Sequence, residues 1–437
     1  MNTCGLSGEG RDEVDLGRLG ASFDPMSTPS HDELVAVLHE FQHQAPVYYW
    51  DKFDMWIVSE YAPIDHVLRD AATFSARGKL TAGDDWYSPA VWDTLESTSH
   101  RRGGGTAVMG SSDGEDHKRL RDPFKAAFQP RSINSYEGLV AAVCSELLSE
   151  LRPLGTAEWV SQFGKVLPMR VVLEILGLPR SDAHLLGRWS DSLIDLTTAT
   201  LGPAAQLEKA KDVAGFEAYM RSAMHERRRQ PGKYPGLMDD ILSAISSGRE
   251  QMNDDELVAS WTIEMLLGGH ETTAAALTTS LWHFLHDRRL WDRLCAEPAV
   301  IGGAVEEMLR YEAPTLGLFR QTTVETTIAG TTLPAGARVY WLNYGANHDE
   351  KHFNAPDRID LDRTNASSHL TFGKGVHNCI GAPLARLEMR VAYEQLVSWL
   401  PGIRLAPEQG ALEYKPSIRL RTPKALHVEW DRSAAVS

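Results

Sequence analysis

The feature that most constrains the fold is a long stretch, residues 133–300, in which apolar residues recur at helical spacing. It includes ELVASWTIEMLLGGHETTAAALTTSLWHFL, where apolar side chains return every three or four residues. Strand-like segments are short and few. VYYWDKFDMWIVS predicts an early hairpin, and TTIAGTTLPAGARVYWL predicts a strand, a Pro-Ala-Gly turn and a second strand. The pattern predicts a mainly α fold with small peripheral β-sheets.

Charge and cysteine usage argue against several classes of protein. The 44 Lys and Arg against 59 Asp and Glu give a formal net charge of −15, which argues against a nucleic-acid binder. The four cysteines form no C-x-x-C pair, which argues against a disulfide framework or zinc ribbon and is typical of a reducing cytoplasm. Neither a signal peptide nor a membrane span is evident, so we expect a soluble, cytoplasmic protein.

No repeat or long linker divides the chain. We expect a mobile N-terminal segment, residues 1–20, followed by a single domain over residues 21–437. Residues 78–116, which include TAGDDWYSP and RRGGGTAVMGSSDGED, predict a long surface connection with a short helix inside it. Connections of this length are often functional.

One cysteine, Cys379, lies in TFGKGVHNCIGAPLARLEMR among three glycines and directly before a helical run. The glycines allow the backbone to approach a flat, bulky group, and a helix running on from Ile380 favours a negative sulfur, so we expect a lowered pKa. A lone cysteine cannot build a tetrahedral zinc site, and His377 is poorly placed as the base of a nucleophile. An axial thiolate on haem iron and a buried cysteine at an ordinary helix start are the alternatives left.

A glycine-containing helix, MLLGGHETTAAAL, carries polar residues on one face. Glu264, Gly268 and Thr272 step by four, so they share a face. A mid-helix threonine such as Thr272 often donates to the carbonyl four residues earlier, here that of Gly268, and so bends the helix. The result would be a groove with a hydroxyl and an adjacent carboxylate, that of Glu271. The alternative is a glycine-softened core helix.

Two further pairs have helical spacing. Glu307 and Arg310 in EEMLRY lie at i, i+3, and His117 and Arg121 in DHKRLRDPF lie at i, i+4. Such pairs are common on solvated faces, so each is unspecific by itself.

The segment FGKGVHNCIG, Phe372 to Gly381, resembles the haem-binding loop of the cytochrome P450 family, with each fixed position filled. The other motifs occur upstream in the family's order. The resemblance implies the cytochrome P450 fold, with haem b (iron protoporphyrin IX) buried between the distal helix and the cysteine loop and with the thiolate of Cys379 as axial ligand. The residues that it implies in haem binding are Phe372, Gly373, His377, Cys379, Gly381, Gly268, His117, Arg121 and Arg320. Among them His117, Arg121, Arg320 and His377 match positions that pair the two haem carboxylates.

The resemblance also implies roles in catalysis and in support of the loop. Glu271 and Thr272 match the family's acid–alcohol pair, which delivers protons to dioxygen. Glu307 and Arg310 match a buried pair that is joined by an arginine, here Arg363, and that fixes the cysteine loop.

Electrons are expected from separate proteins, a ferredoxin and a ferredoxin reductase, because no flavin or nicotinamide domain follows Ser437. A basic set on segments flanking Cys379 is the expected docking surface for an acidic ferredoxin; the alternative is ordinary solvated charge. Its members are Lys118, Arg119, Lys125, Arg386 and Arg390.

The substrate pocket is the part on which the sequence says least. The family's pocket walls correspond to Leu267, Gly268, Leu316, Leu318 and Ile418, an apolar lining. Glu264 departs from the apolar residue usual at its position: either it meets a polar or cationic group of the substrate, or it rotates outward into solvent. Trp86, Tyr87 and Trp92 are candidates for capping the pocket.

The implied function is a haem-thiolate monooxygenase that hydroxylates or epoxidises a small organic molecule in bacterial natural-product biosynthesis. Desaturation or phenolic coupling on the same fold is an alternative. A haem sensor or ligand carrier would need Cys379 but neither Glu271 nor Thr272. A helical interaction protein without a cofactor would leave the glycine-rich loop unexplained.

Overall fold

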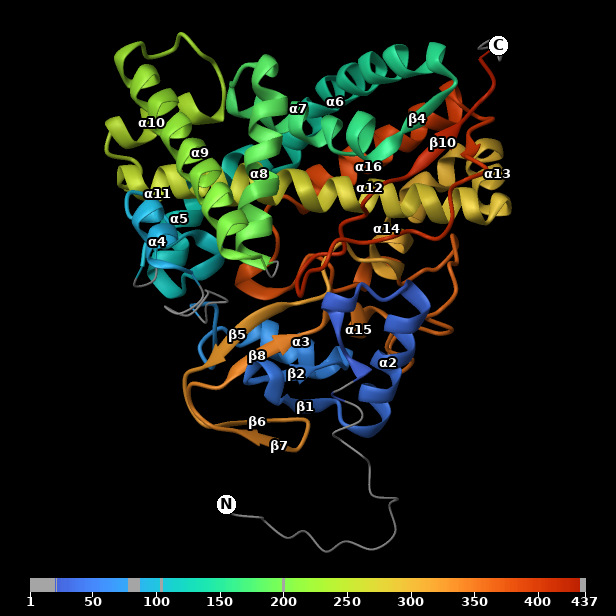
Figure 1. The fold of residues 1–437 in the computed structure, drawn as a ribbon, viewed down its shortest axis with the longest axis horizontal. Helices are drawn as coiled ribbons and strands as arrows, with labels where there is room; N and C mark the ends of the chain where they lie inside the picture. Colours follow the sequence, from blue (N-terminus) through green and yellow to red (C-terminus); the bar gives the residue numbers. More distant parts are fainter. Residues whose placement is uncertain (1–19, 21, 78–86, 103–104, 199–200, 433–437) are drawn as a thin grey trace, which may run out of the picture.

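The computed structural model describes residues 20, 22–77, 87–102, 105–198 and 201–432, without the side chains of residues 197 and 198. The predicted mobile segment 1–20, apart from residue 20, and Trp86 lie outside this part of the chain. The predicted class is confirmed, because the molecule consists mainly of helices, with small sheets at its periphery (Figure 1). Within the described residues, no helix is long and apolar enough to cross a lipid bilayer.

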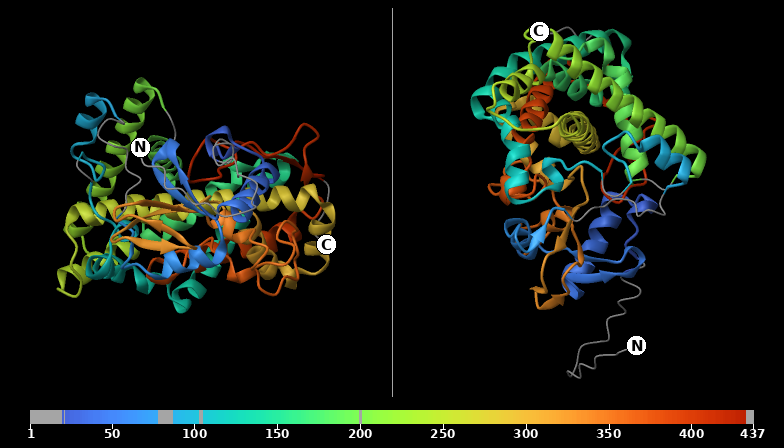
Figure 2. Two further views of the ribbon diagram at one scale, coloured as in Figure 1. Left: turned by 90° about the horizontal axis from the view of Figure 1, so that it is seen from below. Right: turned by 90° about the vertical axis from the view of Figure 1, so that its left-hand side faces the viewer.

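A continuous helical segment through the middle of the molecule organises the fold, and we call it the central helix. It comprises α11 (Asp254–Ala259), the π-helical turns η8 (Ser260–Leu267) and α12 (Gly268–His286). A capping box at Asn253 starts it: the Asn253 side chain accepts from the Glu256 N–H, and the Glu256 side chain accepts in return. Figure 1 shows the segment crossing the molecule, and Figure 2, right, shows it end-on inside a ring of other helices. A helix in this position must be apolar on most of its circumference, as this one is.

The remaining helices surround the central helix and the sheets. They are α2 (His31–Gln44), α3 (Tyr61–Arg69), α4 (Pro89–Leu95), α5 (Gly114–Lys125), α6 (Pro130–Leu151), α7 (Val166–Leu176), α8 (Ala183–Thr198), α9 (Pro203–Arg229), α10 (Leu237–Ser246), α13 (Arg288–Ala296), α14 (Ile301–Tyr311), α15 (Asn343–Asn347) and α16 (Ala382–Trp399). The largest core cluster joins α6, α7, α12, α14 and α16, so α16, which begins three residues after Cys379, is fixed against the central helix.

Three small sheets complete the fold. A five-stranded sheet has the order β1-β2-β8-β5-β3, a three-stranded sheet has the order β4-β10-β9, and β6 pairs with β7. The strands are β1 (Val47–Trp50), β2 (Met55–Val58), β3 (Phe74–Ser75), β4 (Thr156–Glu158), β5 (Leu318–Thr322), β6 (Thr326–Ile328), β7 (Thr331–Leu333), β8 (Arg338–Trp341), β9 (Arg404–Leu405) and β10 (His427–Glu429).

The two strand predictions fared differently. The early hairpin is confirmed as β1 and β2, with Val47 opposite Val58. The later segment has a third strand, because the turn at Ala329 and Gly330 divides the first predicted strand into the antiparallel pair β6 and β7. Beyond the Pro-Ala-Gly turn, β8 pairs with β2 and β5.

The connection 78–116 has the short helix that the sequence predicts, α4, but the prediction that it lies on the surface is wrong for its middle part. Tyr87, Val91, Trp92 and Leu95 pack with residues of α8 and α9 in a buried cluster. Leu267 of the central helix packs against the same cluster. Apolar side chains on one face of α4 therefore anchor the connection to the helical layer.

Candidate active site

The cysteine loop, Phe372–Gly381, is held in a tight turn by its own backbone. The Cys379 N–H donates to the Phe372 carbonyl at 2.8 Å. Gly373 and Gly375 have φ of +63° and +69°, and a Cβ atom at position 375 would lie 2.4 Å from the Leu68 carbonyl oxygen. Only glycine accommodates both this conformation and this close approach. The following helix, α16, begins at Ala382, two residues later than predicted.

The Cys379 side chain has free surface although protein atoms surround it closely. It opens into a recess of about 320 Å³. The recess is lined by Arg121, Lys125, Phe128, Gln129, Asn378, Ile380, Ala382, Pro383 and Arg386, besides Cys379 itself. Burial raises the thiol's pKa, against the opposing effects of the Gly381 and Ala382 N–H groups and of the Arg121 charge. The predicted lowering is thus wrong for the polypeptide alone, because desolvation outweighs these donors.

The central helix presents one face with free surface. The Thr272 hydroxyl donates to the Gly268 carbonyl at 3.0 Å, which is the bond that the sequence suggests. Glu264, Leu267, Gly268 and Thr272 keep accessible surface, whereas Met265, Leu266 and most of α12 are buried. The charge of Glu264 raises the pKa of both Arg121 and Cys379, although burial remains the main influence on each group.

Glu264 does not rotate outward into solvent. Its Oε1 accepts the Gly110 N–H at 2.9 Å, from the 3₁₀ turn η3 (Met109–Ser111). Burial raises the pKa of its carboxyl, and the Gly110 N–H and the Arg121 charge oppose that rise.

Glu271 points away from the groove where the sequence analysis put it. Its side chain is 2% exposed, and Lys165 Nζ lies 2.9 Å from its Oε1. Lys165 also pairs with Asp191, and His270 Nδ1 lies 3.4 Å from Glu271. We call these four residues the acid cluster. Burial raises the pKa of Glu271 to about 8, whereas the pKa of Asp191 is strongly lowered, so one proton belongs to Glu271 near neutral pH.

The structure brings Glu307, Arg310 and Arg363 together. Glu307 and Arg310 are both 0% exposed and form two hydrogen bonds of 2.8 Å, and Arg363 Nε lies 3.0 Å from Glu307 Oε2. Arg310 donates to the Asn347 carbonyl at 2.8 Å. The Asn347 side chain bonds to Thr371 and to the Leu370 N–H. The buried ion pair is therefore linked through Asn347 to the start of the cysteine loop.

Four arginine and histidine side chains lie near one another beside the cysteine loop, and we call them the cation cluster. They are His117, Arg121, Arg320 and His377. The rings of His117 and His377 have centroids 4.2 Å apart, and His117 Nε2 is buried without a hydrogen-bond partner. Arg320 is 6% exposed, and its hydrogen bond goes to the Phe319 carbonyl alone. Burial lowers the pKa of Arg320 to about 10 and that of His377 to about 4. Among the described residues, Asp113 is the carboxylate at ion-pair distance from this cluster, 3.4 Å from His377 Nε2.

The remaining candidates divide by their surroundings. Leu267 and Leu318 keep free surface, but Leu316 and Ile418 are 3% and 6% exposed in a core cluster with Phe319 and Tyr340. Each member of the basic set pairs with a carboxylate. The pairs are Lys118–Asp122, Arg119–Glu256, Lys125–Asp122, Arg386–Glu306 and Arg390–Glu137. The set is therefore not a surplus of positive charge, because the acidic chain supplies local partners.

Sequence reasoning missed several neighbours of these residues. Lys165, Asp191 and Gly110 become relevant only through tertiary contacts, and no local signal marks them. Asp113 had a signal, since it lies one helical turn before His117. Its carboxylate accepts from Ser75 Oγ at 2.5 Å and from the Ala76 N–H, and lies 3.4 Å from His377 Nε2.

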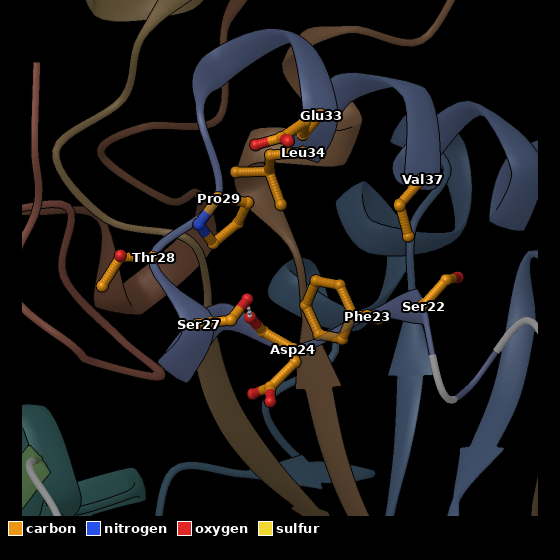
Figure 3. A pocket seen from close by; sticks show the side chains of 9 residues that line it. All are labelled: Ser22, Phe23, Asp24, Ser27, Thr28, Pro29, Glu33, Leu34 and Val37. Carbon is orange, nitrogen blue, oxygen red and sulfur yellow. Dashed lines mark hydrogen bonds between the residues drawn. The ribbon is translucent and has the colours of Figure 1, made fainter. Parts of the chain in front are cut away.

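A second hollow, of about 370 Å³, is unrelated to these residues. It lies between the 3₁₀ turn η1 (Pro25–Ser27) and α2 and is lined by side chains such as Phe23, Leu34 and Val37 (Figure 3). None of the residues discussed above lines it.

Known proteins resemble this chain over most of its length. A family model described as cytochrome P450 matches residues 192–399. A mycinamicin IV hydroxylase/epoxidase from Micromonospora griseorubida is 32% identical over 383 residues, which are 86% of this chain and 90% of that protein. A biotin biosynthesis cytochrome P450 from Bacillus subtilis is 31% identical over 381 residues, 87% of this chain and 91% of the other. The chain belongs to the cytochrome P450 family.

The fold agrees with that membership. The crystal structure of the P450 heme domain of Tepidiphilus thermophilus matches with a TM-score of 0.85 at 29% identity, over 96% of this chain and 99% of that one. This cytochrome P450 is therefore an oxidoreductase, a monooxygenase of a family that uses small-molecule substrates, oxygen and redox partners. The family holds haem through a cysteine thiolate.

Proposed function

We propose that this cytochrome P450 binds haem b through the thiolate of Cys379, between the central helix and the cysteine loop, and inserts oxygen into a small organic substrate. The observation that carries the proposal is that the exposed sulfur of Cys379 lies on a glycine-containing loop beside His117 and His377, where buried His117 Nε2 has no hydrogen-bond partner among the described residues. When bound, the haem would supply dioxygen activation, and an axial thiolate favours cleavage of the O–O bond.

The cation cluster supports a ligand with two carboxylates. Among the described residues, buried His117 Nε2 has no hydrogen-bond partner and the Arg320 guanidinium has no carboxylate at ion-pair distance. Both conditions are costly unless a ligand satisfies them. Arg121 and Arg320 would pair with the haem carboxylates, and neutral His117 and His377 would donate to them. Phe372, Gly373 and Gly381 would shape the loop against the haem face, and Gly268 would allow its approach from the other side.

Glu271 and Thr272 are consecutive residues of α12 and would act together in proton delivery. The Thr272 hydroxyl lies on the free face, where it would hold a proton on the side of the helix that faces the proposed haem site. Glu271 keeps its proton near neutral pH and lies in the acid cluster. A proton would pass from Glu271 toward Thr272 as the Lys165 ion pair rearranges.

Glu307, Arg310 and Arg363 would act structurally. Two guanidinium groups compensate one buried carboxylate, and the Asn347 link carries this rigidity to Thr371 beside the cysteine loop. They would fix the position of the sulfur.

Electrons would come from a separate ferredoxin, reduced by a ferredoxin reductase, that docks at the recess beside Cys379. Lys125 and Arg386 line this recess, but Arg386 is tied to Glu306 and stacks over Phe372. Lys125 pairs with Asp122 of its own helix, but its side chain is 51% exposed and supports no residue of the cysteine loop, so it is the better probe. Reversing its charge in Lys125→Glu should slow ferredoxin-supported reduction at low salt, whereas Lys52→Glu on the distant β1–β2 hairpin should not. Equal reduction rates in the two variants would remove this docking site.

The substrate class is suggested only broadly. Relatives at about this identity are named as a hydroxylase/epoxidase of mycinamicin IV and a C-12 hydroxylase of erythromycin. We propose hydroxylation or epoxidation in bacterial natural-product biosynthesis. No observation favours desaturation, coupling or a purely sensory role over it.

The deciding test is the absorption spectrum of the dithionite-reduced protein with carbon monoxide. We expect a strongly red-shifted Soret band from a thiolate opposite the gas. Cys379→Ser should lose this band, and Cys295→Ser should keep it, because Cys295 lies on α13 outside the site. A band at the position of ordinary histidine-ligated haem, or no haem after expression with added haem, would overturn the proposal.

A further inference from the structure

Glu264 is an acidic side chain on the free face of the central helix, and the described residues give it no counter-ion. Among the described residues, no Lys, Arg or His lies within ion-pair distance of its carboxylate, and its hydrogen bond is the one from the Gly110 N–H. That bond engages Oε1 and leaves Oε2 free. Elsewhere in the site the carboxylates are paired: Glu307 has two guanidinium groups and Glu271 has Lys165.

Arg121 is the cation that affects Glu264 electrostatically, but it does not form an ion pair with Glu264. Arg121 interacts with Glu264 only over a longer distance, and its Nη2 donates to the Asn378 carbonyl at 2.7 Å. In the proposed function, on which this inference rests, Arg121 pairs with a haem carboxylate. Glu264 would then have still less compensation.

Gly110 is shaped to hold this carboxylate. A Cβ atom at position 110 would lie 3.1 Å from Glu264 Oε1, which is closer than ordinary van der Waals contact. The absence of a side chain lets the backbone N–H reach the carboxylate and fix its direction. An anion that is held in place, partly desolvated and unpaired is unfavourable unless a ligand brings positive charge.

We infer that Glu264 determines specificity for an organic cation: the substrate is an alkylammonium compound with an apolar body. The ammonium group pairs with the free oxygen of Glu264, and Leu267 and Leu318, which keep free surface, contact the apolar body. Glu264 precedes Gly268 by about one turn of the central helix. The oxidised carbon therefore lies several bonds from the nitrogen.

Binding of matched probes to the haem-loaded protein tests this inference. We would use phenylalkyl-trimethylammonium ions with chains of two to eight carbons, each beside the neutral compound in which carbon replaces nitrogen. Quaternary nitrogen has no lone pair, so it cannot bind iron. Dissociation constants come from calorimetry, which does not depend on turnover. We expect the charged member of the best-binding pair to bind at least about tenfold more tightly.

Three variants separate the cause. Glu264→Gln keeps the acceptor for Gly110 but removes the charge, so the preference for the charged probe should vanish while the neutral probe binds within about twofold. Gly110→Ala should weaken the preference by displacing the carboxylate. Asp255→Asn removes an exposed carboxylate of the same helix, paired with Arg221, and should change nothing.

Two results would overturn the inference: charged probes that bind no better than neutral ones, or not at all, and a preference that survives in Glu264→Gln. Neither result affects the proposed function, which fails instead on the carbon monoxide spectrum. A preference that follows Glu264 together with a normal carbon monoxide spectrum would support both.

Discussion

Glu264 and Glu271 lie seven residues apart on the central helix, and they meet opposite surroundings. On a regular α-helix such residues would share a face. Here Glu264 meets Gly110 beside the cysteine loop, and Glu271 meets Lys165 and Asp191 from other elements. The π-helical turns between Ser260 and Leu267 change the angular spacing and so separate the two carboxylates. In the proposed function, the same helix thus presents the unpaired carboxylate of Glu264 to a ligand and the protonated carboxyl of Glu271 to the proton relay.

The largest expected effect is on stability and concerns a third carboxylate, that of Glu307, which is fully paired. Glu307→Gln leaves the buried guanidinium groups of Arg310 and Arg363 uncompensated, so the free energy of unfolding should fall by about 3–5 kcal/mol. The urea midpoint measures this. Glu208→Gln on exposed α9 should cost less than about 0.5 kcal/mol. Similar losses in the two variants would mean that the Glu307 pairs do not stabilise the loop.

The next prediction contrasts the two carboxylates directly. Glu271→Gln removes the acid of the proposed relay, and the maximal rate should fall about 100-fold with little change in substrate affinity. Glu264→Gln should instead change affinity for a cationic probe. Steady-state dioxygen consumption and product formation, measured with the best-binding probe, separate the rate from the affinity. If Glu271→Gln changed affinity and left the rate intact, the assignments would have to be exchanged.

The acid of the relay should also be visible in the pH dependence. Because burial raises the pKa of Glu271 to about 8, its proton is present below that pH and is lost above it. Turnover should therefore fall about tenfold per pH unit above pH 8. Reduction of cytochrome c by the redox partners alone serves as the control. In Glu271→Gln this fall should be absent, and its persistence would point to another group.

The smallest expected effect is the loss of folding stability caused by the unpaired charge of Glu264. The pKa of Glu264 is raised by folding, so the folded protein holds its proton more tightly, and stability is lost as pH rises from the unfolded value of 4.5 through the folded value. Glu264→Gln should therefore be about 1 kcal/mol more stable than the parent above that range, without ligand, and equal to it below. Thermal unfolding at two pH values measures the difference. A variant that is less stable at high pH would show that Glu264 already has a stabilising partner.

The features that the sequence predicts correctly depend on interactions between residues close together in the chain. The Thr272–Gly268 bond, the hairpin of β1 and β2 and the mainly helical class follow from spacing within one segment, and the structure has them. The buried state of α4 did not follow, because an amphipathic seven-residue helix in a polar connection has no visible partner until α8 and α9 pack on it. The prediction of a lowered pKa for Cys379 was wrong because the sequence shows the neighbouring N–H donors but not how far packing removes the thiol from water.

The sequence by itself determined the family, through the cysteine loop, the glycine-containing helix and the Glu307–Arg310 spacing, because each motif is local and their order is specific. Tertiary structure alone decided which carboxylate is paired. Lys165, Asp191 and Gly110 reach the central helix from segments distant in the chain. The sequence shows which residues carry charge. Whether a charge is compensated depends on distances of a few ångströms that packing sets, because Coulomb energy and desolvation both vary steeply with position.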